Sequence, residues 1–98
     1  MVKVTERAIV KLQQVLLKKH AGPGQGVRLT ADDTGGFALV IGAPQEGDVM
    51  IRREEAPVLI LARAAAVRLK GLVVDFRPAT EDPRRPPGFV VRRPRRLA

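Results

Sequence analysis

The stretch VLILARAAAVRLKGLVVDF, residues 58–76, decides the fold. Its first part, Val58–Leu61, is a continuous apolar run, which is typical of a buried strand. Residues 62–69 are rich in alanine and predict two helical turns, which Lys70-Gly71 would end. Leu72–Phe76 predicts a second strand. The stretch therefore predicts a strand, a short helix and a further strand.

Before this stretch, the sequence predicts one longer helix from Thr5 to Lys19. Thr5 suits the N-cap, because its hydroxyl can accept a hydrogen bond from an amide of the first helical turn. Gly22-Pro23-Gly24 would stop the chain from continuing as a helix. Apolar residues recur within the segment at helical spacing and predict one buried stripe: Ala8, Ile9, Leu12, Val15 and Leu16.

Short strands are predicted elsewhere. Residues 27–31 alternate apolar and polar, as in a half-buried strand, and residues 32–36 predict the turn of a hairpin. Phe37–Ile41 is a continuous apolar run, which predicts a strand covered on both faces. Val49–Ile51 and Phe89–Val91 are shorter strand candidates, and Arg52–Glu55 predicts a charged turn. The order predicts an α+β, mostly β fold: a sandwich of about six short, mainly antiparallel strands with an N-terminal helix and a short internal helix.

Composition limits what this chain can do. It has 98 residues and a net charge of +8, and we expect one domain over residues 1–94 with a basic tail at 95–98. The absence of cysteine excludes disulfides, thiolate metal sites and a cysteine nucleophile. Because we find no leader-like segment and no apolar run long enough to span a bilayer, we expect a cytoplasmic protein.

Several motifs occur in an order that resembles the HesB-like family of A-type iron–sulfur carriers, the IscA kind. They are Gly26-Val27-Arg28-Leu29, Asp48-Val49-Met50-Ile51, the strand–helix–strand stretch ending in Asp75-Phe76, and Gly88-Phe89-Val90-Val91-Arg92-Arg93-Pro94. Together they span nearly the whole chain. The resemblance implies the HesB-like fold, a two-sheet sandwich of short mixed strands.

The same resemblance implies cluster ligands that this chain lacks. The family has one cysteine in the first hairpin loop and a Cys-x-Cys at its C terminus. Here the loop is Asp33, Thr34, Gly35, Gly36 and Phe37, and the chain ends Arg95-Arg96-Leu97-Ala98. The family's Asp and Ser near the short helix are matched by Ala62 and Ala65, and its Asn before the last proline by Arg93. We therefore expect no bound cofactor, and a non-catalytic accessory or binding protein related to cluster assembly.

Oxygen ligands are the alternative to thiolates at the loop. Asp32 and Asp33, with Asp48 or His20 nearby, could hold a hard cation such as Mg, Ca or Mn. The favoured interpretation is that these aspartates and the Gly35-Gly36 pair only form a tight turn. A lone histidine supports neither a triad nor a metal site. Glu54-Glu55 would point to opposite faces of a strand. No catalytic residue is predicted.

A basic C-terminal segment suggests a second function, the binding of nucleic acid. Arginine side chains bind phosphate through paired hydrogen bonds. The candidates are Arg84, Arg85, Arg92, Arg93, Arg95 and Arg96. Tyrosine and tryptophan, which would stack on bases, are absent from the sequence, and this weakens the hypothesis. As for protein partners, we expect an unidentified one, or self-association through a sheet edge.

Overall fold

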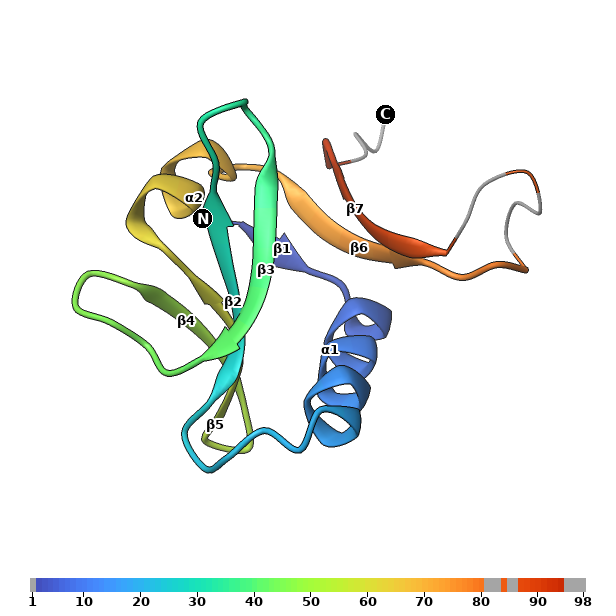
Figure 1. Cartoon of the computed structure of the whole chain (residues 1–98). Helices are drawn as coiled ribbons and strands as arrows, with labels where there is room; N and C mark the ends of the chain where they lie inside the picture. Colours follow the sequence, from blue (N-terminus) through green and yellow to red (C-terminus); the bar gives the residue numbers. More distant parts are fainter. Residues whose placement is uncertain (1, 81–83, 85–86, 95–98) are drawn as a thin grey trace.

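The computed structural model describes residues 2–80, 84 and 87–94. Within them, the chain forms two helices and seven short strands (Figure 1). The elements are β1 (Lys3–Val4), α1 (Glu6–Lys18), β2 (Gly26–Ala31), β3 (Phe37–Gly42), β4 (Val49–Arg53), β5 (Ala56–Leu61), α2 (Arg63–Arg68), β6 (Val73–Arg77) and β7 (Gly88–Arg92). This arrangement confirms the predicted α+β, mostly β class with one N-terminal and one short internal helix.

The strands form two sheets of mixed direction. The larger sheet has the order β3-β2-β5-β4, and the smaller has the order β1-β6-β7. The β2–β5 and β1–β6 pairs are parallel, whereas the other three pairs are antiparallel. β1 was missed by the sequence analysis, because two residues are too few to show a period. The central strand β5 is buried over Val58–Leu61, as its apolar run predicts.

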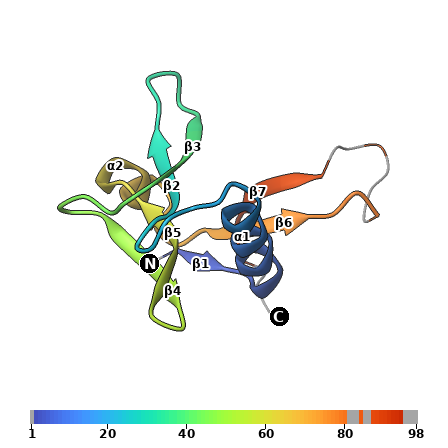
Figure 2. The same cartoon turned by 60° about the horizontal axis from the view of Figure 1, so that its bottom comes forward.

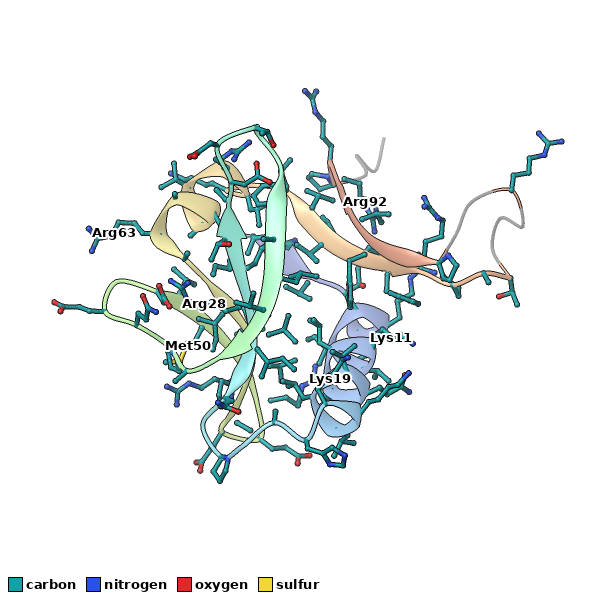
Figure 3. All side chains as sticks on the ribbon, in the orientation of Figure 1. Lys11, Lys19, Arg28, Met50, Arg63 and Arg92 are labelled. Atoms are coloured by element: carbon teal, nitrogen blue, oxygen red, sulfur yellow. The ribbon has the colours of Figure 1, made fainter. Side chains whose placement is uncertain are left out.

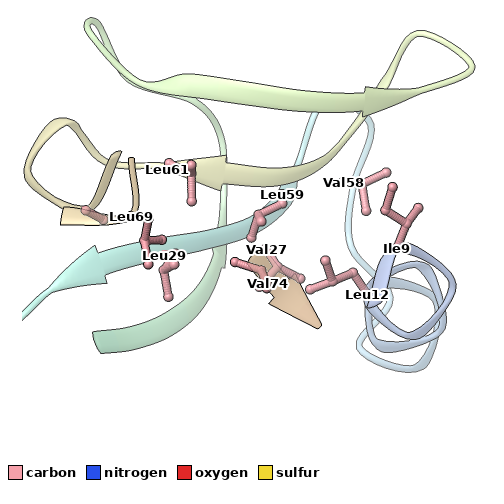
Figure 4. Packing of buried hydrophobic residues seen from close by; sticks show 10 residues of the cluster. Ile9, Leu12, Val27, Leu29, Val58, Leu59, Leu61, Leu69 and Val74 are labelled. Carbon is pink, nitrogen blue, oxygen red and sulfur yellow. The ribbon is translucent and has the colours of Figure 1, made fainter. Parts of the chain in front are cut away.

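The helix α1 and both sheets share one core. α1 contacts β5 of the larger sheet and β6 of the smaller one (Figure 2). Ile9 and Leu12 of the helix pack into a cluster with residues of β2, β5, α2 and β6 (Figure 4). Leu12, Leu59 and Leu61 are each 1% exposed. The apolar stripe read from the sequence is therefore the side of the helix that faces the core.

The two ends of α1 have defined caps. The Thr5 hydroxyl accepts a hydrogen bond from Ala8 N at 3.3 Å, as predicted. At the other end, Ala21 N donates to Leu16 O at 3.0 Å and His20 N to Leu17 O at 3.1 Å. This pattern is a Schellman motif, and it puts His20 at φ 55°. The single histidine thus occupies the position where helices most often have glycine.

Two expectations about strands are wrong. Phe37–Ile41 is not covered on both faces, because β3 is an edge strand whose Leu39 and Val40 are 47% and 51% exposed. A continuous apolar run cannot distinguish a central strand from an edge strand. The charged turn expected at residues 52–55 is also shorter. β4 extends to Arg53, and only Glu54 and Glu55 form the turn, both with positive φ.

No helix in the described part of the chain combines the length and the apolar character needed to cross a bilayer.

Candidate functional site

The β2–β3 loop, where the resemblance would place a ligand cysteine, is closed by its own hydrogen bonds. Asp32 Oδ1 accepts from Thr34 N at 2.9 Å, from Thr34 Oγ1 at 2.7 Å and from Gly36 N at 2.8 Å. The Thr34 hydroxyl and these two amides hold the pKa of Asp32 below its usual range. The Asp32 carboxylate is therefore committed to closing the turn.

The loop is also attached to α2. Arg68 Nη2 donates to Gly35 O at 2.5 Å, and its guanidinium carbon lies 4.9 Å from the centroid of the Phe37 ring. Gly35 has φ 88°, as the turn interpretation predicts. Gly36 is needed for a different reason, because a Cβ there would lie 2.9 Å from Asp32 Oδ2. Arg68 thus connects the tip of this hairpin to α2, and the two glycines fit its tight turn.

The oxygen ligands considered for a hard cation do not come together. His20 precedes β2 and the loop follows it, so the strand separates them. Asp48 binds Arg28 instead. Among the residues that the structure describes, no group of three or more histidine, aspartate or glutamate side chains is arranged to hold a metal ion.

Arg28 and Asp48 form an ion pair that joins two segments of the fold. Arg28 Nε lies 3.0 Å from Asp48 Oδ2 and Arg28 Nη2 lies 3.2 Å from Asp48 Oδ1, a paired geometry. Gln45 N also donates to Asp48 Oδ2, at 2.8 Å. The Arg28 guanidinium holds the pKa of Asp48 below its usual range, although burial opposes this shift. The pair connects β2 to the segment that enters β4.

Asp75 is the centre of a larger polar cluster that the sequence analysis did not single out. It lies in β6, is 3% exposed, and binds Arg7 through Nε at 2.7 Å and Nη2 at 2.8 Å. It also accepts from Thr5 Oγ1 at 2.5 Å, from Phe76 N at 2.8 Å and from Arg92 Nε at 3.5 Å. The Arg7 guanidinium, together with the Thr5 hydroxyl and the Phe76 amide, holds the pKa of Asp75 well below its usual range, although burial opposes this shift.

These contacts assign a structural role to the polar residues of the motifs. Arg28, Asp48 and Asp75 all belong to the segments that carry the family resemblance. Each of them is engaged in a short ion pair between elements that are distant in the sequence. A signal for this role was present in the sequence, since each is a charged residue beside or within an apolar strand.

The C-terminal arginines that the structure describes, Arg84, Arg92 and Arg93, do not form one site. Arg92, labelled in Figure 3, lies at the end of β7. It contacts Asp75, with 3.5 Å between Arg92 Nε and Asp75 Oδ2. Arg84 lies in the connection between β6 and β7, next to the end of the hairpin where Arg77 pairs with Gly88. Arg92 and the exposed Arg93 lie at the opposite end, where Arg92 pairs with Val73. Arg85, Arg95 and Arg96 lie outside the described residues. The described arginines therefore support no common phosphate site.

Comparison with known proteins identifies the fold. No protein-family model matches the chain, and no curated protein sequence does. Among the similar solved structures are two that match this chain over most of their length. One is Escherichia coli SufA, involved in biosynthesis of iron–sulfur clusters, with TM-score 0.68, 22% identity, and coverage of 94% of this chain and 84% of SufA.

The other is IscA with a [2Fe-2S] cluster, with TM-score 0.56, 22% identity, and coverage of 96% of this chain and 83% of IscA. The expected fold, that of the A-type iron–sulfur carriers, is thereby confirmed.

Proposed function

We propose that this protein is a degenerate HesB-like domain that carries no thiolate-bound cluster and acts in the cytoplasm as a non-catalytic accessory or binding protein related to iron–sulfur cluster assembly. One observation carries the proposal: the chain has the fold of SufA and IscA over nearly its full length, yet contains no cysteine. Fold alone does not supply function, because the chemistry depends on the residues at the site.

The loop offers no substitute for the missing thiolates. Iron–sulfur clusters are held mainly by cysteine sulfur, whereas carboxylates favour hard cations. Asp32 already accepts three hydrogen bonds within the loop, and the cationic Arg68 lies against the loop backbone. The residues present therefore do not fit a cluster.

The polar contacts that hold the frame support a role in binding rather than in chemistry. The ion pairs of Arg28 with Asp48 and of Arg7 with Asp75 join elements of the fold through side-chain contacts. A stable frame without ligands can still present a surface to a protein partner.

The test is anaerobic reconstitution with ferrous iron and sulfide, followed by gel filtration. We expect the protein fraction to stay colourless and to hold no stoichiometric iron, while IscA, whose solved structure contains a [2Fe-2S] cluster, is treated in parallel as the positive control. Visible charge-transfer absorption accompanied by stoichiometric iron and sulfide on this chain would overturn the proposal.

A further inference from the structure

The edge strand β3 lacks the usual protection of a sheet edge. Natural edge strands carry charges, prolines or bulges, or they are covered, since an open edge can pair with another chain. β3 has the sequence FALVIG, with neither a charge nor a proline, and pairs on one side only with β2 in the described part of the chain. Leu39 and Val40 are about half exposed.

The backbone of β3 offers hydrogen bonds at this edge. Leu29 of β2 pairs with Leu39, but the Leu29 carbonyl accepts from Ala62 N at 3.0 Å on the β5 side. Antiparallel pairs alternate between hydrogen-bonded and non-bonded. The N–H and C=O of Leu39 therefore point away from β2, and those of Phe37 and Ile41 do the same.

A groove of about 450 Å³ lies beside this edge, between α1, β3 and β7. Its walls are mainly apolar and include Leu12 and Val15 of α1, Leu39 and Ile41 of β3, and Phe89 of β7. We call this feature, with the open edge of Phe37–Gly42, the β3 groove. An added strand could continue the larger sheet and put alternate side chains into it.

The charge around the β3 groove is positive. Lys19 is the charged residue in its lining, and an adjoining depression on α1 is lined by Lys11, Lys18 and Lys19. Figure 3 labels Lys11 and Lys19 on this helix. Neither lining includes an acidic residue. A segment with acidic residues at its ends would match this rim.

We propose that the β3 groove binds an extended segment of another protein that is apolar at alternate positions and has acidic flanks. This inference rests on the proposed binding function and names its partner class. A second copy of the chain fits less well, because each copy carries a net charge of +8 and pairing two β3 edges would bring two lysine rims together.

The test uses displayed peptide libraries against the full chain. One library has six randomised positions, matching the six residues of β3, between paired acidic residues; the second has lysines in place of the acids. We expect only the acidic library to be enriched, with apolar residues at alternate positions. Binding of the corresponding synthetic peptides should weaken with salt and should protect the amides of Leu39 and Ile41 from hydrogen exchange.

Two variants locate the binding. Leu39→Glu should raise the Kd about tenfold or more, the factor expected when the burial of one leucine is lost. Leu17→Glu is the matched control, because Leu17 is an exposed leucine of α1 outside the groove and should leave the Kd unchanged. Leu39→Pro should also weaken binding, since it removes an outward N–H and spares the β2–β3 ladder. Circular dichroism checks the fold of each variant.

Several results would overturn the inference: enrichment of neither library, enrichment of the lysine library, or peptide binding that survives Leu39→Glu. Sedimentation showing a dimer that Leu39→Glu dissociates would also overturn it, since the occupant would then be a second copy. These failures are separable from that of the proposed function. A chain that stays colourless on reconstitution but binds no peptide loses only the β3 groove as a docking site.

Discussion

At the scale of single residues, the Asp75 carboxylate accepts hydrogen bonds from several side chains. Its carboxylate in β6 accepts from Thr5, which caps α1, from Arg7 in the first turn of α1, and from Arg92 in β7. A buried carboxylate is tolerated only when such partners replace its water. One side chain therefore joins three elements.

We predict that Asp75→Asn lowers the free energy of unfolding by about 2–3 kcal/mol at pH 7. The loss stays below that of a fully buried ion pair, because the Arg7 side chain is 47% exposed. Urea unfolding followed by circular dichroism measures it. Asp33→Asn, the same change at an exposed loop position, is the control and should cost less than about 0.5 kcal/mol.

The pH dependence of the free energy of unfolding follows from the direction in which folding shifts the pKa of Asp75. The pKa of Asp75 is lowered in the folded state, so its contribution is present above the unfolded pKa of 3.8 and is lost as the pH falls below it. The free energy of unfolding should therefore fall more steeply as the pH is lowered from about 4 to about 2 in the parent chain than in Asp75→Asn. Equal slopes would show that Asp75 is not the responsible carboxylate.

At the scale of elements, the β4–β5 hairpin contains backbone strain. Arg53 pairs with Ala56, so Glu54 and Glu55 form a two-residue turn with φ 52° and 68°. Turns of this kind favour Asn-Gly, because both central residues need positive φ. A charged turn over Arg52–Glu55 was expected from the sequence, and in the structure the turn consists of the two glutamates alone.

Replacing the pair, Glu54→Asn with Glu55→Gly, should stabilise the protein by about 1 kcal/mol, since the left-handed conformation is strained for ordinary side chains. In a chain of this size the melting temperature should rise by roughly 4–8 °C in calorimetry. The control is Glu54→Gln with Glu55→Gln, which removes the charges but keeps the strain. An equal gain in the control would assign the effect to charge.

At the scale of the whole molecule, one cluster connects the two sheets. It includes Ile9 and Leu12 of α1, Val27 of β2, Leu59 of β5 and Val74 of β6. Since neither sheet has a separate core in this cluster, we expect the described elements to unfold together. A domain of about this size has a small free energy of unfolding.

We predict that Leu12→Ala lowers the free energy of unfolding by about 2–4 kcal/mol, because it removes buried methyl groups and leaves a cavity. The loss of helical circular dichroism and the loss of hydrogen-exchange protection at the β6 amides should have the same denaturant midpoint. The matched control is Leu17→Ala on the same helix, where the side chain is 77% exposed, and it should change little. Separate midpoints for α1 and β6 would contradict a shared core.

By itself, the sequence determined the features that depend on local spacing and on composition. Four features could be read directly, because neighbouring residues or simple counts establish them. They are the N-cap Thr5, the apolar stripe of α1, the buried run of β5 and the absence of cysteine. The order of motifs was also sufficient for the fold.

Only the tertiary structure decided which strand lies at an edge and which charges meet. β3 and β5 are similar apolar runs, yet strand order leaves one exposed and buries the other. Arg7 and Asp75 form an ion pair although they are far apart in the sequence. The Asp32 carboxylate accepts a hydrogen bond from the Gly36 amide and so closes the β2–β3 turn. The physical reason is that pairing partners and burial follow from contacts between distant segments, which local periodicity does not contain.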